Sequence, residues 1–227
     1  MKAILINGSP RKKGHTAALL DKVREGLDAG GSETKTVHLR DIGAFSGCIS
    51  CLACKVKGSK CDGVCAIRDG LRPLLQETKD ADILVVGSPV YFHYPVAAVR
   101  AFTERFLFPQ LDYTNSGTPL LKKKIHSACL FTMHIWDDET FVANGYEHTL
   151  GATARGFELV GSCETLYFKG LTMFDPPERY VVGQNLVDTF TAMERDHYAE
   201  YERTAFALGK RLADRATAQQ AQNVKAY

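Results

Sequence analysis

The sequence of 227 residues lacks several patterns that would assign it at once to a familiar class. No apolar run approaches the roughly 20 residues that a membrane-spanning helix needs. The spacing G-x-S-x-G is missing, so we do not expect a serine hydrolase of the esterase type. A formal net charge of +2 gives no general case for binding nucleic acid or a membrane. The first strand is expected to begin directly at the N-terminus, which leaves no room for a signal peptide. We therefore expect a cytoplasmic protein.

The N-terminal stretch also lacks both common phosphate-binding patterns, G-x-G-x-x-G and G-x-x-x-x-G-K-[ST]. It has instead an apolar run at residues 3–6, the turn formers Asn7-Gly8-Ser9-Pro10 and three cations at 11–13. An amphipathic helix then opens at 14–16. Backbone N–H groups and the helix dipole both favour an anion at such a position. The pattern predicts a phosphate site, although an ordinary strand-to-helix turn on a basic surface would use the same residues.

Short apolar runs alternate with amphipathic segments and predict one α/β domain over residues 1–227. The expected strands are 3–6, 34–39, 83–86, 125–133 and 162–168. The expected helices are 16–29, 69–75, 96–106, 139–157 and a last one that starts at 185 or 195 and ends at 216. A polar tail that frays is expected after residue 216. The four consecutive apolar residues at 83–86 indicate burial on both faces of a parallel sheet. We therefore expect a doubly wound, five-stranded parallel sheet with helices on both faces and ligands at the carboxyl ends of its strands.

Three interruptions of this pattern are informative. A cysteine-rich loop covers residues 43–66, a polar connection covers 109–121, and an inserted loop covers about 169–184. The segment 88–95, which follows the buried strand, carries three aromatic residues and a histidine. These side chains could cap the core, form an interface or hold a flat aromatic ligand.

The loop GSPRKKGHT resembles the phosphate loop of flavodoxin-like NAD(P)H-dependent FMN reductases and their iron–sulfur flavoprotein relatives, which commonly reads G-S-P-R-x-x-G-N-T. The segment ADILVVGSPVYF, followed by VRAFTERF, is similar to the flavin-ring segment of that family, typically A-D-x-I-I-x-G-S-P-V-Y-F and then K-x-F-x-D-R. His15 stands where Asn is usual, and Arg100 and Glu104 replace Lys and Asp. The resemblance covers roughly residues 1–165 and implies a flavodoxin-like fold with bound FMN.

The resemblance implies that the first loop holds the phosphate and the second lines the flavin ring. A third loop follows the strand at 125–133, where relatives often have a glycine-rich turn at the flavin edge. The chemistry belongs to the flavin, so no catalytic side chain is required. The implied cofactor-binding residues are Ser9, Pro10, Arg11, Lys13, Gly14, His15, Thr16, Pro89, Val90, Tyr91, Phe92, Thr132, Met133 and His134.

Five of the seven cysteines lie close together in the sequence. In a reducing compartment such thiols indicate a metal or redox role rather than disulfides. The spacing Cys48-x2-Cys51-x2-Cys54-x6-Cys61 resembles the compact motif of iron–sulfur flavoproteins, which implies a [4Fe–4S] cluster on these four, with Cys65 as a spare. Spacing alone does not choose the metal, so a zinc site or plain thiols remain open.

The resemblance implies an oxidoreductase that takes electrons from NAD(P)H or a ferredoxin-type protein. It would pass them to a flavin, quinone or other small acceptor, as a homodimer or homotetramer. Two other functions stay open: an electron carrier for a protein partner, and a regulatory flavin- or metal-binding protein without turnover. Elsewhere, we expect the charged helix surface at 194–203 to face solvent, and Cys129 and Cys163 to be small buried hydrophobes.

Overall fold

A parallel sheet organises the computed structural model, which describes residues 1–59, 61–114, 121 and 123–225. Its order is β2-β1-β3-β5-β6, every neighbouring pair is parallel, and the short β4 pairs antiparallel with the end of β3. The strands are β1 (Lys2–Asn7), β2 (Glu33–His38), β3 (Ile83–Tyr91), β4 (Tyr94–Pro95), β5 (Ile125–Thr132) and β6 (Gly161–Phe168). This order is the flavodoxin-like, doubly wound arrangement, and it confirms the predicted fold.

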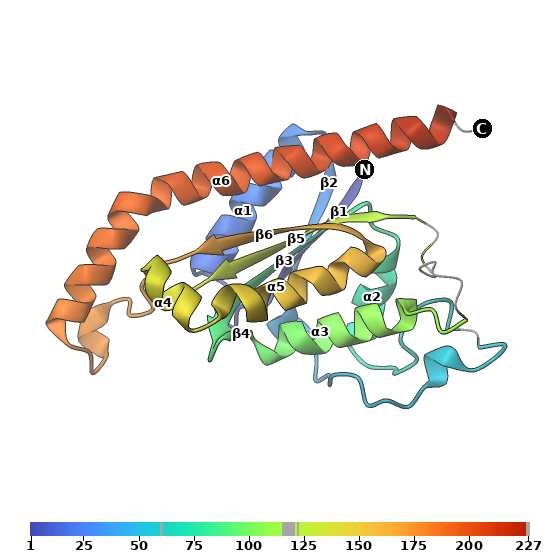
Figure 1. Cartoon of the computed structure of the whole chain (residues 1–227), viewed down its shortest axis with the longest axis horizontal. Helices are drawn as coiled ribbons and strands as arrows, with labels where there is room; N and C mark the ends of the chain where they lie inside the picture. The colour runs from blue at the N-terminus through green and yellow to red at the C-terminus, as the bar shows by residue number, and fades with distance from the viewer. Residues whose placement is uncertain (60, 115–120, 122, 226–227) are drawn as a thin grey trace.

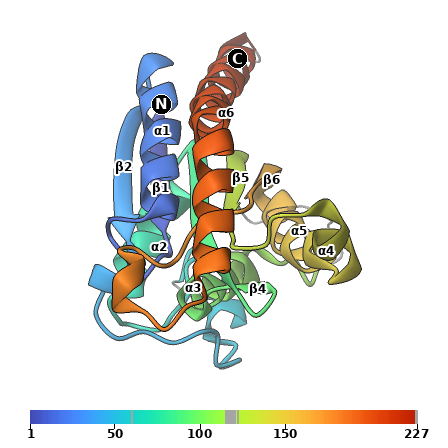
Figure 2. The same ribbon diagram turned by 90° about the vertical axis from the view of Figure 1, so that its left-hand side faces the viewer.

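Helices cover both faces of the sheet, as Figures 1 and 2 show. Side chains of β1 alternate between the faces: Ala3 and Leu5 pack with α1 and α6, whereas Ile4 and Ile6 belong to the core under α2, α3 and α5. The helices are α1 (His15–Ala29), α2 (Leu71–Lys79), α3 (Ala97–Leu107), α4 (Asp138–Ala143), α5 (Tyr146–Phe157) and α6 (Gln184–Lys225). Burial on both faces explains why β1 and β3 contain continuous apolar runs.

The last helix is longer than the sequence analysis predicted. α6 has 42 residues, and the expected fraying tail after residue 216 is helical as far as residue 225. That tail is rich in alanine and glutamine, which favour helix, so the prediction was wrong in giving it no structure. Figure 1 shows the first part of α6 extending past the sheet. Neither α6 nor any other helix among the described residues has an apolar stretch long enough to cross a membrane.

Two other predictions need correction. The helix expected over 139–157 is broken into α4 and α5, because Gly145 adopts a left-handed conformation with φ of 66° between them. The strand expected over 83–86 continues to residue 91, where pairing with β4 extends it. Part of the connection predicted at 109–121, namely residues 115–120, lies outside the described residues.

Helices α1 and α6 pack with their backbones in close contact. A Cβ atom placed on Gly209 would lie 2.1 Å from the carbonyl oxygen of Val23, and one on Gly26 would lie 2.1 Å from that of Phe206. Only glycine therefore allows this approach at either position. The contact closes the apolar core on that face of the sheet, where Leu208 is fully buried.

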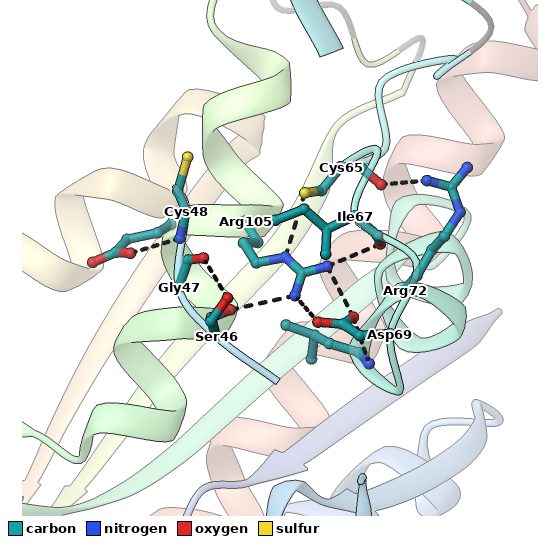
Figure 3. A network of polar contacts seen from close by, with 10 residues as sticks. Ser46, Gly47, Cys48, Cys65, Ile67, Asp69, Arg72 and Arg105 are labelled. Carbon is teal, nitrogen blue, oxygen red and sulfur yellow. Dashed lines mark hydrogen bonds and ion pairs between the residues drawn. The ribbon is translucent and has the colours of Figure 1, made fainter. Parts of the chain in front are cut away.

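A buried guanidinium fastens the cysteine-rich loop to α3 (Figure 3). Nε of Arg105 donates a hydrogen bond to Sγ of Cys65 over 3.3 Å. Nη2 donates to the carbonyl oxygen of Ile67 over 3.2 Å and to Oδ1 of Asp69 over 3.0 Å. A buried charge is costly unless it is paired and hydrogen-bonded, and here each nitrogen of the guanidinium has a partner.

The opposite end of the same loop is held by the neighbouring residue of α3. Oε2 of Glu104 accepts a hydrogen bond from the backbone nitrogen of Cys48 over 3.0 Å. Nη1 of Arg105 also donates to the carbonyl oxygen of Ser46 over 3.3 Å. Two adjacent side chains of one helix thus position both ends of the cysteine-rich loop.

We predict that Gly209→Ala lowers the free energy of unfolding by about 2 kcal/mol, because its methyl group must push the backbone of α1 away. Gly151→Ala on α5 is a matched control, since the group within 3.4 Å of its Cβ is the mobile end of Arg155. That variant should gain stability, by about 0.5–1 kcal/mol. Chemical denaturation measures both, and equal effects would contradict the close helix contact.

The ion pair between Asp69 and Arg105 should make the free energy of unfolding depend on pH in the acid range. Hydrogen bonds from Arg105 hold the pKa of Asp69 below its usual range, although desolvation opposes this shift. The charged carboxylate therefore stabilises the fold above the unfolded-state pKa of about 3.9, and this contribution is lost as the pH falls through the lower folded-state pKa.

Asp69→Asn should lower the free energy of unfolding by roughly 3 kcal/mol near neutral pH, because it leaves a buried charge unpaired. The difference from the parent should shrink as the pH is lowered below about 4. Denaturant unfolding at several pH values measures this. Asp196→Asn on the exposed surface of α6 is the control, and a constant difference at every pH would contradict the prediction.

Candidate functional site

The loop after β1 is folded by its own short side chains. Oδ1 of the buried Asn7 accepts a hydrogen bond from the backbone nitrogen of Ser9 over 2.9 Å. Oγ of Ser9 then accepts one from the backbone nitrogen of Arg11 over 3.1 Å. These two local turns explain why Asn and Ser stand at these positions, and they direct the chain towards the start of α1.

The same loop lies directly against β3. The backbone nitrogen of Gly8 donates to the carbonyl oxygen of Gly87 over 2.8 Å. A Cβ atom on Gly8 would lie only 2.2 Å from a methyl group of Val99. Glycine is therefore required at position 8, because a larger residue would clash with Val99. The loop after β1, which is the predicted phosphate site, is thus held beside the central strand β3.

Helix α1 begins without a side-chain cap. Its N-cap residue, Gly14, has an extended backbone, and the first turn contains no acidic residue. The positive end of the helix dipole and the first backbone N–H groups thus have no competing carboxylate from this turn. Lys13 stands beside them and has no ion-pair partner among the described residues. This arrangement suits a phosphate group.

The second predicted loop is a β-hairpin between β3 and β4. Its two turn residues, Phe92 and His93, have φ of 48° and 72°, as the tightest hairpin turns require. The His93 ring stacks on Tyr146 of α5, with ring centroids 4.4 Å apart. The Phe92 side chain is 93% exposed at the tip, whereas residues 89–91 line a cavity.

That cavity has a volume of about 800 Å³ and lies at the carboxyl ends of β1, β3 and β5. The hydroxyl groups of Thr16 and Thr132 meet there at 2.7 Å and join the first loop to the third. All predicted cofactor-binding residues except Pro10 and Phe92 line it: Ser9, Arg11, Lys13, Gly14, His15, Thr16, Pro89, Val90, Tyr91, Thr132, Met133 and His134. Its size is typical of a cofactor site.

One wall of the cavity comes from the inserted loop, which sequence reasoning left without a role. The carbonyl oxygen of Thr172 accepts a hydrogen bond from Nε2 of His15 over 3.1 Å, and that of Met173 accepts one from Nη1 of Arg11 over 3.0 Å. Tyr180 contributes to the same wall. No local pattern could have predicted these contacts, because they join residues 157 and 162 positions apart.

Glu194 on α6 was expected to face solvent, and this expectation was wrong. Its Oε2 accepts a hydrogen bond from the backbone nitrogen of Thr172 over 3.0 Å and lies 3.4 Å from Nε2 of His15. The carboxylate thereby holds the inserted loop and the first loop together. Tyr198, one helical turn further along, meets the His15 ring edge-on and also lines the cavity.

The third loop places His134 between aromatic rings. Its Nδ1 donates to the carbonyl oxygen of Leu171 over 3.1 Å, its ring stacks on Phe190, and Phe174 meets it edge-on. Burial lowers the pKa of His134, so the ring is neutral near neutral pH. Because Nδ1 carries the proton, Nε2 is left as an acceptor.

The four cysteines of the predicted cluster motif do not converge. Among the described residues, no group of three or more His, Cys, Asp or Glu is placed to hold a metal ion. Cys48, Cys51 and Cys54 line a narrow apolar pocket together with Cys65, which was expected to be a spare. Cys61 lies outside this pocket, and its Sγ donates to a backbone carbonyl 3.7 Å away. As placed, the predicted set does not fit a cluster.

The remaining cysteines lie within the sheet. Cys129 is buried, as predicted, and its Sγ is 3.9 Å from that of the half-buried Cys163 on the neighbouring strand. The hydrogen bond with Cys163 and burial raise the pKa of the Cys129 thiol well above its usual range. A protonated thiol in a strand interior is consistent with a packing role.

Two curated relatives each match about half of the chain. Iron–sulfur flavoproteins of Archaeoglobus fulgidus and Methanocaldococcus jannaschii are 34% identical over 109 residues and 35% identical over 105 residues. These matches cover 47% and 46% of this chain, and 46% and 51% of the relatives, so the chain spans about half the length of the curated relatives it matches.

The fold as a whole also has solved counterparts. The NAD(P)H:quinone oxidoreductase from Methanothermobacter marburgensis superposes with a TM-score of 0.60 at 15% identity, covering 93% of this chain and 96% of that one. At this identity the likeness concerns the fold alone. The family model for NADPH-dependent FMN reductase matches residues 1–129, which is more than half of the chain. The chain therefore belongs to the NADPH-dependent FMN reductase family.

Proposed function

We propose that the chain is an FMN-dependent oxidoreductase that takes electrons from NAD(P)H and passes them to a flavin, quinone or other small acceptor. One observation carries the proposal: a single cavity is lined both by an uncapped helix N-terminus with neighbouring cations and by residues 89–91, which offer apolar and aromatic surface. FMN has matching parts, an anionic phosphate and a flat aromatic ring. The membership in the FMN reductase family supports the same cofactor.

The residues of the cavity divide into two groups by chemistry. Ser9, Arg11, Lys13 and Thr16, with the N–H groups of α1, would hold the phosphate. Residues 89–91 would line the ring. When bound, FMN supplies the hydride and single-electron chemistry, so the protein binds and orients it and controls access of water.

Electron donation can be tested directly on the chain loaded with FMN. We expect the purified protein to bind FMN, its flavin absorbance to bleach without oxygen on addition of NADPH or NADH, and the colour to return when menadione is added. Bound flavin that neither nicotinamide bleaches would contradict the proposed enzyme and favour a regulatory protein. Reduction by a reduced ferredoxin alone would favour an electron carrier. Failure to bind FMN would contradict the cofactor itself.

The phosphate site has its own test. Arg11→Gln should weaken FMN binding by roughly 10- to 100-fold, since hydrogen bonds to charged groups contribute about 1.5–3 kcal/mol. Binding of riboflavin, which has no phosphate, should hardly change, and quenching of flavin fluorescence measures both affinities. Arg24→Gln removes the same charge from the outer side of α1, where Asp21 and Asp28 pair with it, and serves as control. Equal losses for FMN and riboflavin would place Arg11 outside the phosphate site.

A further inference from the structure

A second cavity lies between α1 and β2, the edge strand of the sheet. Its volume is about 330 Å³, which is within the range of small-molecule sites. Thr36 of β2 lies level with Leu5, whose side chain packs with α1 and α6, so this face of β2 is turned towards α1. Thr36 and His38 therefore bring polar side chains into a position where the neighbouring strand has apolar ones.

This second cavity adjoins the cofactor cavity at its phosphate end. Lys12, Ala17 and Asp21 line both cavities, and they belong to the first loop and the first turns of α1. Among the described residues that line the second cavity, none belongs to segment 89–91, which we propose for the flavin ring. A group attached to the phosphate of a bound flavin could therefore extend into the second cavity.

A chain of hydrogen bonds fixes the polarity of His38. The backbone nitrogen of Ser9 donates to Oδ1 of Asn7, so Nδ2 of that amide is the group that donates to Nδ1 of His38 over 3.0 Å. Because Nδ1 accepts, the neutral ring of His38 carries its proton on Nε2. Nε2 has no hydrogen-bond partner among the described residues, and it is left as a donor.

The other polar groups of the cavity complement this donor. The hydroxyl group of Thr36 is buried and has no partner among the described residues, and the carboxylate of Asp21 is an acceptor. Adenosine offers the matching groups: its ring nitrogens accept hydrogen bonds and its ribose hydroxyls donate them. Acidic side chains are a common partner of ribose hydroxyls in α/β folds. The ammonium group of Lys12, which lines both cavities, suits a phosphate between them.

We propose that the second cavity binds the adenosine phosphate half of FAD, while the flavin and its own phosphate occupy the cofactor cavity. The inference rests on the proposed function, because it uses the same flavin site. NADH and NADPH also contain an adenosine phosphate, but their nicotinamide has to reach the flavin ring. In FAD the adenosine is joined to the flavin phosphate itself. A cavity that adjoins the phosphate end therefore favours FAD.

Calorimetric titration of the flavin-free chain with FAD and with FMN tests the proposal without any variant. FAD should bind at least about 10-fold more tightly than FMN, because two further polar groups gain hydrogen-bond partners. Equal or weaker binding of FAD would overturn the proposal and leave the FMN-dependent oxidoreductase in place. Failure of both flavins to bind would overturn the proposed function as well.

Filling the second cavity locates the adenosine. Thr36→Phe should abolish the tighter binding of FAD relative to FMN. Lys35→Phe adds the same ring to the opposite, exposed face of β2, so that variant should retain the difference. Thr36→Val removes only the hydroxyl and should reduce the difference by about 2- to 10-fold. Tighter binding of FAD that persists unchanged in both Thr36 variants would overturn the proposal.

The nicotinamide donors provide the last comparison. With FMN bound, the KM values for NADPH and NADH should be the same in Thr36→Phe and in Lys35→Phe. A rise in KM confined to Thr36→Phe, together with an unchanged preference for FAD, would assign the cavity to the adenosine of the donor and overturn the proposal for FAD. Circular dichroism of each variant shows that its fold is intact.

Discussion

The parallel pairing of β1 with β3 is the interaction on which the candidate site depends. It brings Asn7, the last residue of β1, level with Gly87, so the loop after β1 lies beside the carboxyl-terminal part of β3. The bond from Gly8 to Gly87 continues this ladder into the first loop. A Cβ on Gly87 would lie 2.6 Å from Leu20, so α1 also packs closely at this point. The helix N-terminus and the hairpin therefore open into one cavity, which is the common location of ligands in such sheets.

Helix α3 links the candidate cofactor cavity to the cysteine-rich loop. It starts after the hairpin that lines the cavity, and near its other end Glu104 and Arg105 hold the cysteine-rich loop. Its 11 residues correspond to about 16 Å of helix, so the separation between the cavity and the cysteine-rich loop is set by a rigid element. The buried pair of Arg105 and Asp69 anchors this loop, together with the packing of Val64 in the apolar core.

The C-terminal part of the chain completes the cavity. The inserted loop contributes carbonyl groups that engage Arg11 and His15, and Glu194 of α6 fixes that loop in place. The long helix is in turn held against α1 through the glycine contact at Gly26 and Gly209. Segments that lack a match to the FMN reductase model thus shape the entrance and one wall of the site.

Local patterns predicted a parallel sheet and a phosphate site in the loop after its first strand, because apolar runs, turn residues and helix starts act over a few neighbouring residues. Residues 9, 11 and 13–16 could be predicted for this reason. The family resemblance implied the residues of the other two loops. Tertiary structure alone decided that Phe92 points outwards, that Glu194 joins the site and that Cys65 replaces Cys61 in the thiol pocket. These outcomes depend on contacts between distant segments, such as the 40 positions from Cys65 to Arg105, and no local spacing encodes them.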